Sequence, residues 1–467
     1  MAPTRRLLRS LLPLVTVLAC VVACSDDGDP VADGSPTSTT AATSTTIDGV
    51  VDEVDLDDCP PGADASGVTP PSGGDPGSIR VVTTHAADGA FAGDARISYG
   101  AQARFAVENR RGGVEVAGQR YLVEVSPRND AADPVSTRQH VADAFDPEGT
   151  PAFAAFGMVG TENVLAVRDQ LARWCVPDVF PVSSSAAVSV VGGWSVGAPL
   201  VLETTEAWAL VRYVSEVRPD ARMALLVPAG ARGDRIQAAF EDATRDSTAS
   251  VVAVDRVPVA VDTDVRSRVS ALAATEADVF VNAAELLSCP AAMRVADELS
   301  WPALVLAAGG CASSSFLGQA GPAAEGVLSA TNLMDPANER WADNDRMADY
   351  HEAIDRWNRD HPDHEVDPND QPVALGWTMG ELFLQALAGS EGVTRSELMA
   401  SLTAMTATEP GLVLDGITLT TGPADRWLGE AARVVRFDAD TATNAPVGAV
   451  ADFEGGQAVP VDLRPGA

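Results

Sequence analysis

The stretch that decides the fold is Ile79–Val114, IRVVTTHAADGAFAGDARISYGAQARFAVENRRGGV. It begins with the short, mainly apolar run Ile79–Val82, which is typical of a parallel strand that is buried on both faces. A loop of small and polar residues follows. From Asp94 to Arg111 the apolar residues then recur at helical spacing, until Gly112-Gly113 ends the pattern. We therefore expect a strand, a loop and a helix, and in open α/β sheets this loop is where ligands bind.

The alternation of strands and helices continues along the chain. Apolar runs that end in small polar residues predict further strands at Tyr121–Val125, Ala152–Val159, Val179–Val182, Leu200–Glu203, Met223–Val227, Val251–Val254, Val279–Asn282, Leu304–Ala307, Gly326–Thr331, Ile417–Thr420 and Val434–Phe437. Helical patterns fill most of the intervals. Because the strand–helix pattern restarts at Met223, the sequence predicts two consecutive α/β sheets and hence two lobes, which suits a chain of 467 residues.

The first 23 residues predict a signal peptide and not part of the fold. Arg5, Arg6 and Arg9 precede the apolar run Leu11–Ala23, which is too short to cross a membrane. The run ends at Cys24, after which the chain turns polar, and this pattern resembles the lipobox of bacterial lipoproteins. We expect a lipid on Cys24 that anchors an extracytoplasmic protein to the outer face of the cell membrane. Lipidation at Cys20 and ordinary secretory cleavage are the alternatives.

The charge of the chain excludes one class of partner. There are 32 basic and 66 acidic residues, which give a formal net charge of −34. Proteins that bind nucleic acids need a basic stripe, so we expect no nucleic-acid partner. Residues 25–78 contain acidic but no basic residues and include a Ser/Thr-rich segment, so we expect residues 24–78 to form a lipidated flexible tether.

The four remaining cysteines suit an exported protein with disulfides. They are Cys59, Cys175, Cys289 and Cys311, and they allow three connectivities. We favour Cys289–Cys311 together with Cys59–Cys175. Cys289 and Cys311 each follow an apolar strand, and the ends of adjacent parallel strands lie within disulfide reach. Buried free thiols are the alternative.

The order of elements from Ile79 to Phe453 resembles the branched-chain amino-acid (leucine/isoleucine/valine) binding-protein family, the type I periplasmic solute-binding proteins of ABC transporters. The resemblance begins in the opening strand and its small-residue loop, and continues with Asn109, Gly112-Gly113 and the strand Tyr121–Val125. It implies an α/β fold of two doubly wound Rossmann-like lobes joined by a three-segment hinge. Lobe I would comprise residues 79–204 and 332–420, and lobe II residues 205–331 and 421–467. The crossings are expected at Thr204–Glu206, Thr331–Asn332 and Thr421–Leu428.

The same resemblance implies the function. The chain would be a solute-binding lipoprotein of an ABC importer and not an enzyme. A small polar ligand (an amino acid, an amide or a related carboxylate) would bind between the lobes, and the closed protein would dock on the ABC permease subunits in the membrane. We expect a monomer with no cofactor and no metal. A ligand-sensing receptor and an interaction module with the same fold are the alternatives.

Candidate ligand-binding residues on lobe I lie where strands end. Thr84 ends the first strand, and Thr161, Ser184 and Ser185 follow the third and fourth strands. In the family that this chain resembles, positions matching the last three hold the α-carboxylate of the ligand. The alternative is that these hydroxyl groups only cap helices.

Candidate residues on lobe II depart from that family. Arg232 lies near the position of an aromatic residue that contacts the ligand. Gly310 and Cys311 follow the strand after which the family places an acidic residue for the α-ammonium group. Glu285, one loop earlier, is a possible substitute for that acid. Arg232 would suit a second acidic group on the ligand, or it would be a solvated residue at a helix start.

Two further motifs favour no second function. Gly193–Gly197 matches the G-x-S-x-G elbow of α/β-hydrolases, but no helix is expected after it, so we interpret it as a surface loop around Ser195. His361 and His364 are separated by Pro362, which breaks any helix that would place both imidazoles on one face. We interpret that segment as a solvated loop and not as a metal site.

Overall fold

The structure is a computed structural model of the chain, and it describes residues 64, 66–259 and 264–455. Within that part, no helix is both long enough and apolar enough to cross a membrane. The predicted signal peptide, Cys20, Cys24, Cys59 and most of the predicted tether lie outside the described residues.

The first sheet has the order β3–β4–β2–β5–β6–β7, with β1 paired to β2. Its strands are β1 (Val68–Thr69), β2 (Gly77–His85), β3 (Val114–Val116), β4 (Gln119–Asn129), β5 (Ala154–Phe156), β6 (Asp178–Val179) and β7 (Ser195–Val196). Strands β4, β2, β5, β6 and β7 run parallel to one another. Strand β2 therefore lies between the next two parallel strands of the chain, which is the topological switch point of this sheet.

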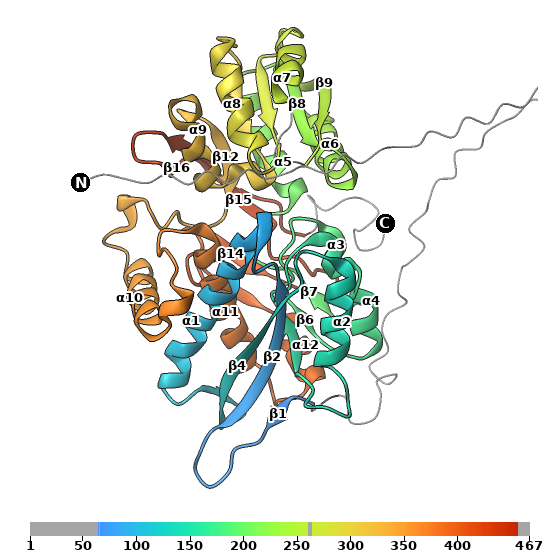
Figure 1. Cartoon of the computed structure of the whole chain (residues 1–467), viewed down its shortest axis with the longest axis vertical. Helices are drawn as coiled ribbons and strands as arrows, with labels where there is room; N and C mark the ends of the chain where they lie inside the picture. The colour runs from blue at the N-terminus through green and yellow to red at the C-terminus, as the bar shows by residue number, and fades with distance from the viewer. Residues whose placement is uncertain (1–63, 65, 260–263, 456–467) are drawn as a thin grey trace, which may run out of the picture. The chain divides into compact units, whose positions relative to one another are not determined.

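Helices cover both faces of the first sheet (Figure 1). On one face, Ile79 and Val81 of β2 pack in a core with α1, α10, α11 and α12. On the other face, Val82 packs with α2, α3 and α4. These helices are α1 (Ala95–Arg110), α2 (Pro134–Ala144), α3 (Thr161–Leu165), α4 (Arg168–Arg173), α10 (Asp345–Asp360), α11 (Gln371–Ala388) and α12 (Arg395–Leu402). Burial on both faces is the reason why β2 is a mainly apolar run rather than an alternating one.

The second sheet has the order β16–β15–β12–β11–β10–β8–β9. Its strands are β8 (Arg222–Pro228), β9 (Ser250–Val257), β10 (Val279–Asn282), β11 (Leu304–Ala307), β12 (Leu328–Thr331), β15 (Ala431–Asp438) and β16 (Thr443–Asp452). Strands β9, β8, β10, β11 and β12 are parallel, and β15 and β16 add to them antiparallel. The switch point of this sheet is β8, which lies between β9 and β10.

The second sheet is also covered on both faces. Helices α5 and α6 pack on the face that carries Leu225 and Val281, whereas α7 and α8 pack on the face that carries Leu226 and Phe280. The helices are α5 (Glu203–Val217), α6 (Ala231–Thr244), α7 (Val265–Ala273), α8 (Ser288–Glu298) and, next to Cys289, α9 (Ser314–Ala320). The short strands β13 (Thr406–Thr408) and β14 (Thr418–Thr420) form a separate pair.

Three sequence predictions differ from this fold. Leu200–Glu203 is not a strand, because Leu202 caps α5 and Glu203 begins that helix, while the strand beside β6 is β7. The predicted tether extends to residue 78, but Val68–Thr69 pairs with β2 and Asp64 accepts hydrogen bonds from Ser396. Gly193–Gly197 is not a surface loop: Ser195 lies in β7, is 2% exposed and shares a hydrogen bond with Ser189.

Two glycines allow α1 and α11 to touch through their backbones. A Cβ atom at Gly376 of α11 would lie 1.8 Å from the carbonyl oxygen of Ile97, and a Cβ atom at Gly100 of α1 would lie 2.1 Å from that of Val373. Such distances are far below van der Waals contact. The position of α1, and with it the loop between β2 and α1, therefore depends on the absence of side chains at both points.

We expect Gly376→Ala to lower the free energy of unfolding by about 2 kcal/mol or more, because α1 and α11 must separate to admit the methyl group. Urea denaturation of residues 25–467 measures this effect. The matched control is Gly318→Ala in α9, where the nearest atom to the new Cβ is 3.8 Å away. The control should leave stability unchanged or raise it slightly. Equal stability of the two variants would contradict the close helix contact.

Asp178 of β6 is a buried carboxyl group without a hydrogen-bond partner. Its side chain is 1% exposed, and neither oxygen receives a hydrogen bond. Burial raises the pKa of Asp178 to about 8, and the nearby Arg168 opposes this shift only in part. The carboxyl group is consequently mostly protonated in the folded protein at neutral pH.

This raised pKa predicts a stability that falls as the pH rises. Between about pH 4 and pH 8 the unfolded chain has lost the Asp178 proton while the folded chain keeps it, so each pH unit lowers the free energy of unfolding. In Asp178→Asn this contribution is absent. From pH 5 to pH 8, we expect wild type to lose at least about 1 kcal/mol relative to the variant in urea titrations.

The control for Asp178→Asn is Asp169→Asn. Asp169 pairs with the same Arg168, at 3.0 Å, but its side chain is 56% exposed. The pH dependence of this control should follow wild type. Parallel pH profiles for wild type and Asp178→Asn would refute the protonated state of Asp178.

Candidate ligand-binding site at the strand edges

The polar groups of the first sheet gather where β2, β5 and β6 end. The Oγ1 of Thr161, the first residue of α3, lies 2.8 Å from the Oγ of Ser183. Thr84 is 0% exposed at the end of β2, and its hydroxyl has no hydrogen-bond partner. Ser185 accepts a hydrogen bond from the N–H of Ala187 and caps a short 3₁₀ helix, which is the structural role that the sequence left open for these hydroxyl groups.

The polar groups of the second sheet gather at its switch point. Arg232 lies in the first turn of α6, directly after β8, and Glu285 follows the neighbouring strand β10. The guanidinium Nη1 of Arg232 donates to Oε1 of Glu285 at 2.6 Å. The structure therefore pairs two residues that the sequence predicted as separate ligand contacts.

Glu203 connects the two strand edges. Ser184, which follows β6, donates its hydroxyl to Oε1 of Glu203 at 3.3 Å. The same carboxylate receives Nε of Arg235 at 3.1 Å and lies 3.8 Å from Nε of Arg232. With a side chain that is only 5% exposed, Glu203 is the centre of a network that contains Ser184, Arg232, Arg235 and Glu285.

Glu206, one helical turn further along α5, holds the loop after β11. Its Oε2 accepts a hydrogen bond from the backbone N–H of Gly309 at 2.8 Å. Burial raises the pKa of Glu206 to about 7; the Gly309 hydrogen bond opposes this shift, and the neighbouring Glu203 adds to it. Gly310, a predicted ligand contact, lies beside this bond in a 3₁₀ helix and faces open space.

Glu203, Glu206 and Arg235 were not predicted from the sequence as members of the site. Leu200–Glu203 was interpreted as a strand, and Thr204–Glu206 as a crossing between lobes. The start of this helix could have been predicted from Glu203 and Glu206, which are three residues apart, because acidic residues favour the first turn of a helix. A helix starting at Glu203 projects both carboxylates near the strand ends.

A disulfide ties the first turn of α8 to the short 3₁₀ helix that follows β11. Cys289 and Cys311 are bonded, with their Cα atoms 5.6 Å apart, which confirms this part of the predicted connectivity. Cys175 is also disulfide-bonded, whereas its predicted partner Cys59 lies outside the described residues. The Cys289–Cys311 bond links the segment after Glu285 to the turn that contains Gly309 and Gly310.

The histidines of the His361–His364 segment and the serine of the Gly193–Gly197 motif make contacts within the protein. The imidazole of His361 stacks on Trp357 with ring centroids 3.7 Å apart, and Nδ1 of His364 lies 3.3 Å from the hydroxyl of Tyr99. The two histidines are thus engaged with aromatic rings of α10 and α1. Ser195 is buried, as described above, and cannot meet a substrate.

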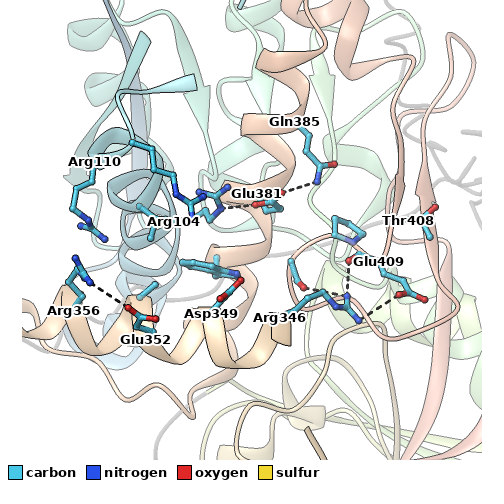
Figure 2. Close-up of a pocket in the computed structure, with 16 residues that line it drawn as sticks. Arg104, Arg110, Arg346, Asp349, Glu352, Arg356, Glu381, Gln385, Thr408 and Glu409 are labelled. Carbon is cyan, nitrogen blue, oxygen red and sulfur yellow. Dashed lines mark hydrogen bonds and ion pairs between the residues drawn. The ribbon is translucent and has the colours of Figure 1, made fainter. Parts of the chain in front are cut away.

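A separate cavity of about 530 Å³ lies between α1, α10, α11 and the segment after β13 (Figure 2). Its charged groups largely satisfy one another. Arg104 pairs with Glu381 at 2.6 Å, and Arg356 with Glu352 at 3.4 Å. Arg346 donates to the carbonyl oxygens of Glu409, Gly411 and Val413, so it holds the segment between β13 and β14 in place. No residue predicted for ligand binding lines this cavity.

Comparison with known proteins agrees with the resemblance seen in the sequence. Residues 78–442 match the sequence pattern of the family described as periplasmic binding protein. No curated protein sequence matches the chain. Several solved structures share its fold at low sequence identity, and three of them illustrate the range.

The first is a branched-chain amino-acid ABC transporter protein from Thermus thermophilus with bound valine (TM-score 0.68, 15% identity, 81% of this chain and 98% of that chain). The second is a solute-binding protein of an ABC transporter from Rhodopseudomonas palustris BisB5 in complex with 3,4-dihydroxybenzoic acid (TM-score 0.64, 16% identity, 80% of this chain and 97% of that chain). The third is a fatty-acid ABC transporter substrate-binding protein from Thermomonospora curvata (TM-score 0.67, 18% identity, 86% of this chain and 98% of that chain).

These matches confirm the predicted fold class, two parallel-dominated α/β sheets of the type I periplasmic binding protein fold. Because the family pattern extends over residues 78–442, the chain belongs to the periplasmic binding protein family, whose members are extracytoplasmic solute-binding proteins and not enzymes.

Proposed function

We propose that this chain is the solute-binding lipoprotein of an ABC importer. It would bind a small ligand with a polar group, such as an amino acid, an amide or a related carboxylate, between the carboxyl edges of its two sheets. The observation that carries the proposal is the network around Glu203, in which Ser184 of the first edge and Arg232 of the second meet. Ligands of doubly wound folds bind at such switch-point edges.

The names of the three similar structures support a ligand with a carboxyl group. Valine, 3,4-dihydroxybenzoic acid and a fatty acid are all carboxylic acids, although they otherwise differ in size and polarity. In our proposal, Thr84, Thr161, Ser184 and Ser185 form the hydroxyl-rich side of the site, and Arg232, Glu285 and Gly310 form the opposite side. The ligand would hold the two sides together, and the closed form would dock on the membrane permease as a monomer.

The lobes of this proposal keep the boundaries expected from the sequence, 79–204 with 332–420 and 205–331 with 421–467. Their support is the division of the core. One core cluster contains residues of the first sheet together with α10, α11 and α12, and a second contains β8, β10 and β12 together with α5, α6 and β15. Glu203 and Glu206 then lie at the first crossing, where a change of lobe angle would move them.

A thermal-shift screen of residues 25–467 tests ligand binding. The panel contains amino acids, amides, aromatic acids, fatty acids, dicarboxylates and sugars. A ligand at about 100 times its Kd should stabilise the folded protein by roughly 2.7 kcal/mol and raise Tm by a few degrees. We expect a carboxylic acid to give the largest rise.

Variants then locate the site. We expect Thr161→Ala and Ser184→Ala to weaken binding of that ligand at least about tenfold, because each removes a hydroxyl group from the strand edge. The control is Ser401→Ala in α12, whose hydroxyl donates to the carbonyl oxygen of Ala386. A panel without any hit, or a hit that survives both edge variants, would contradict the proposal.

The lipid anchor is part of the same proposal. Cys24 stands at the end of an apolar run and before a polar segment, and it lies outside the described residues. We expect the full-length chain, expressed in a bacterial host, to stay with the membrane fraction and to incorporate labelled palmitate. Cys24→Ser should release it to the soluble fraction without label, whereas Cys20→Ser should behave as wild type. Retention of label in Cys24→Ser would move the anchor to another residue.

A further inference from the structure

Three carboxyl groups lie at the second-sheet edge, and each is already engaged. Glu285 is paired with Arg232 at 2.6 Å, and its side chain is 13% exposed. Glu203 has two guanidinium partners and the hydroxyl of Ser184. Glu206 accepts the N–H of Gly309. Among the described residues of this edge, no carboxylate is left without a donor.

This arrangement disfavours a ligand with an ammonium group. To bind one, Glu285 or Glu203 would have to leave a guanidinium partner. The Arg232 side chain is 37% exposed, but the carboxylates of Glu285 and Glu203 are only 13% and 5% exposed, so losing a partner leaves a largely buried negative charge less well compensated. The ammonium group would also lie close to Arg232 and Arg235, whose positive charges repel it.

The arrangement equally limits a second acidic group on the ligand. Arg232 points Nη1 at Glu285 and Nε at Glu203, and its Nη2 lies 3.3 Å from the position of a Cβ at Gly309. The sequence suggested Arg232 as a partner for such a group, but its charge is compensated twice. The second-sheet edge is therefore close to neutral as a binding surface.

The first-sheet edge offers hydroxyl groups instead of charged groups. Thr161 and Ser184 are half-buried there, whereas Thr84 is 0% exposed and Ser183 shares a hydrogen bond with Thr161. The hydroxyl groups of Thr161 and Ser184 can therefore be reached by one polar group of the ligand.

We propose that the site selects a carboxylic acid that lacks an ammonium group, and that the pairing of Arg232 with Glu285 is the feature that rejects amino acids. The single carboxylate meets the hydroxyl groups of Thr161 and Ser184 on the first-sheet edge. This inference rests on the proposed function, since it names the ligand class of the same site.

Matched ligand pairs test the inference directly. Leucine and 4-methylpentanoate differ only in the α-ammonium group, as do phenylalanine and 3-phenylpropanoate. Isothermal titration of residues 25–467 with these four compounds should give, in at least one pair, a Kd for the acid that is at least tenfold lower than the Kd for the amino acid. In the other pair, the amino acid should not bind more tightly than the acid.

A variant should invert the preference. Arg232→Gln leaves the Glu285 carboxylate without its partner, so leucine should gain at least tenfold in affinity relative to 4-methylpentanoate. The control is Arg256→Gln. Arg256 lies on β9 and pairs with Asp234 of α6 at 2.5 Å, and neither residue belongs to the network around Glu203. The control should keep the wild-type ratio.

A second variant guards against misfolding of the first. Glu285→Gln removes the carboxylate but keeps the shape of the side chain, and circular dichroism checks the fold of both. We expect Glu285→Gln to bind the acid more tightly than wild type, because Arg232 then has one compensating carboxylate fewer. An amino-acid binder that uses Glu285 would instead lose its ligand in this variant.

The outcomes separate the inference from the proposed function. If an amino acid binds as tightly as its matched acid or more tightly, the inference is wrong while the chain remains a solute-binding protein. If none of the four compounds binds, the inference is also wrong, and the wider thermal-shift panel then decides the proposed function. A preference for the acid that Arg232→Gln does not change would overturn the role of the ion pair.

Discussion

The candidate site depends on one constraint: neighbouring parallel strands bring their carboxyl ends to the same edge of a sheet. Strands β8, β10 and β11 are adjacent, so Arg232, Glu285 and Gly309 meet although 77 residues separate the first from the last. The first sheet does the same for Thr161 and Ser183. Without this alignment, the charged groups would be scattered over separate loops and no edge could hold a ligand.

Charge compensation shapes the site as strongly as topology does. Glu203 is almost fully buried, and a buried carboxylate needs compensating partners. It accepts hydrogen bonds from Ser184 and Arg235 and forms an ion pair with Arg232; both arginines belong to α6, whereas Ser184 follows β6. The network is complete before a ligand arrives, so binding does not have to order these side chains. The same completeness limits which charges a ligand can carry.

Much of the fold could be predicted because buried parallel strands leave a plain record in the sequence. Val279–Asn282 and Leu304–Ala307 were predicted with the bounds that the structure shows. Predictions were wrong where a strand has only two residues, and where a helix begins directly after an apolar run. Strands β6 and β7 have two residues each, and the helix that begins at Glu203 follows an apolar run that is also typical of a strand. The pairing of Val68–Thr69 with β2 left no pattern, because two residues are too few for one.

The sequence by itself determined the class of fold and the loops that carry the candidate residues, and it favoured the disulfide between Cys289 and Cys311, because strand patterns, loop positions and residue types are local properties. Only the tertiary structure decided which of the candidate residues neutralise one another. Arg232 and Glu285 are 53 residues apart, and they pair because β10 lies next to β8 in the sheet. That order follows from the packing of helices on both faces, and no local pattern along the chain encodes it.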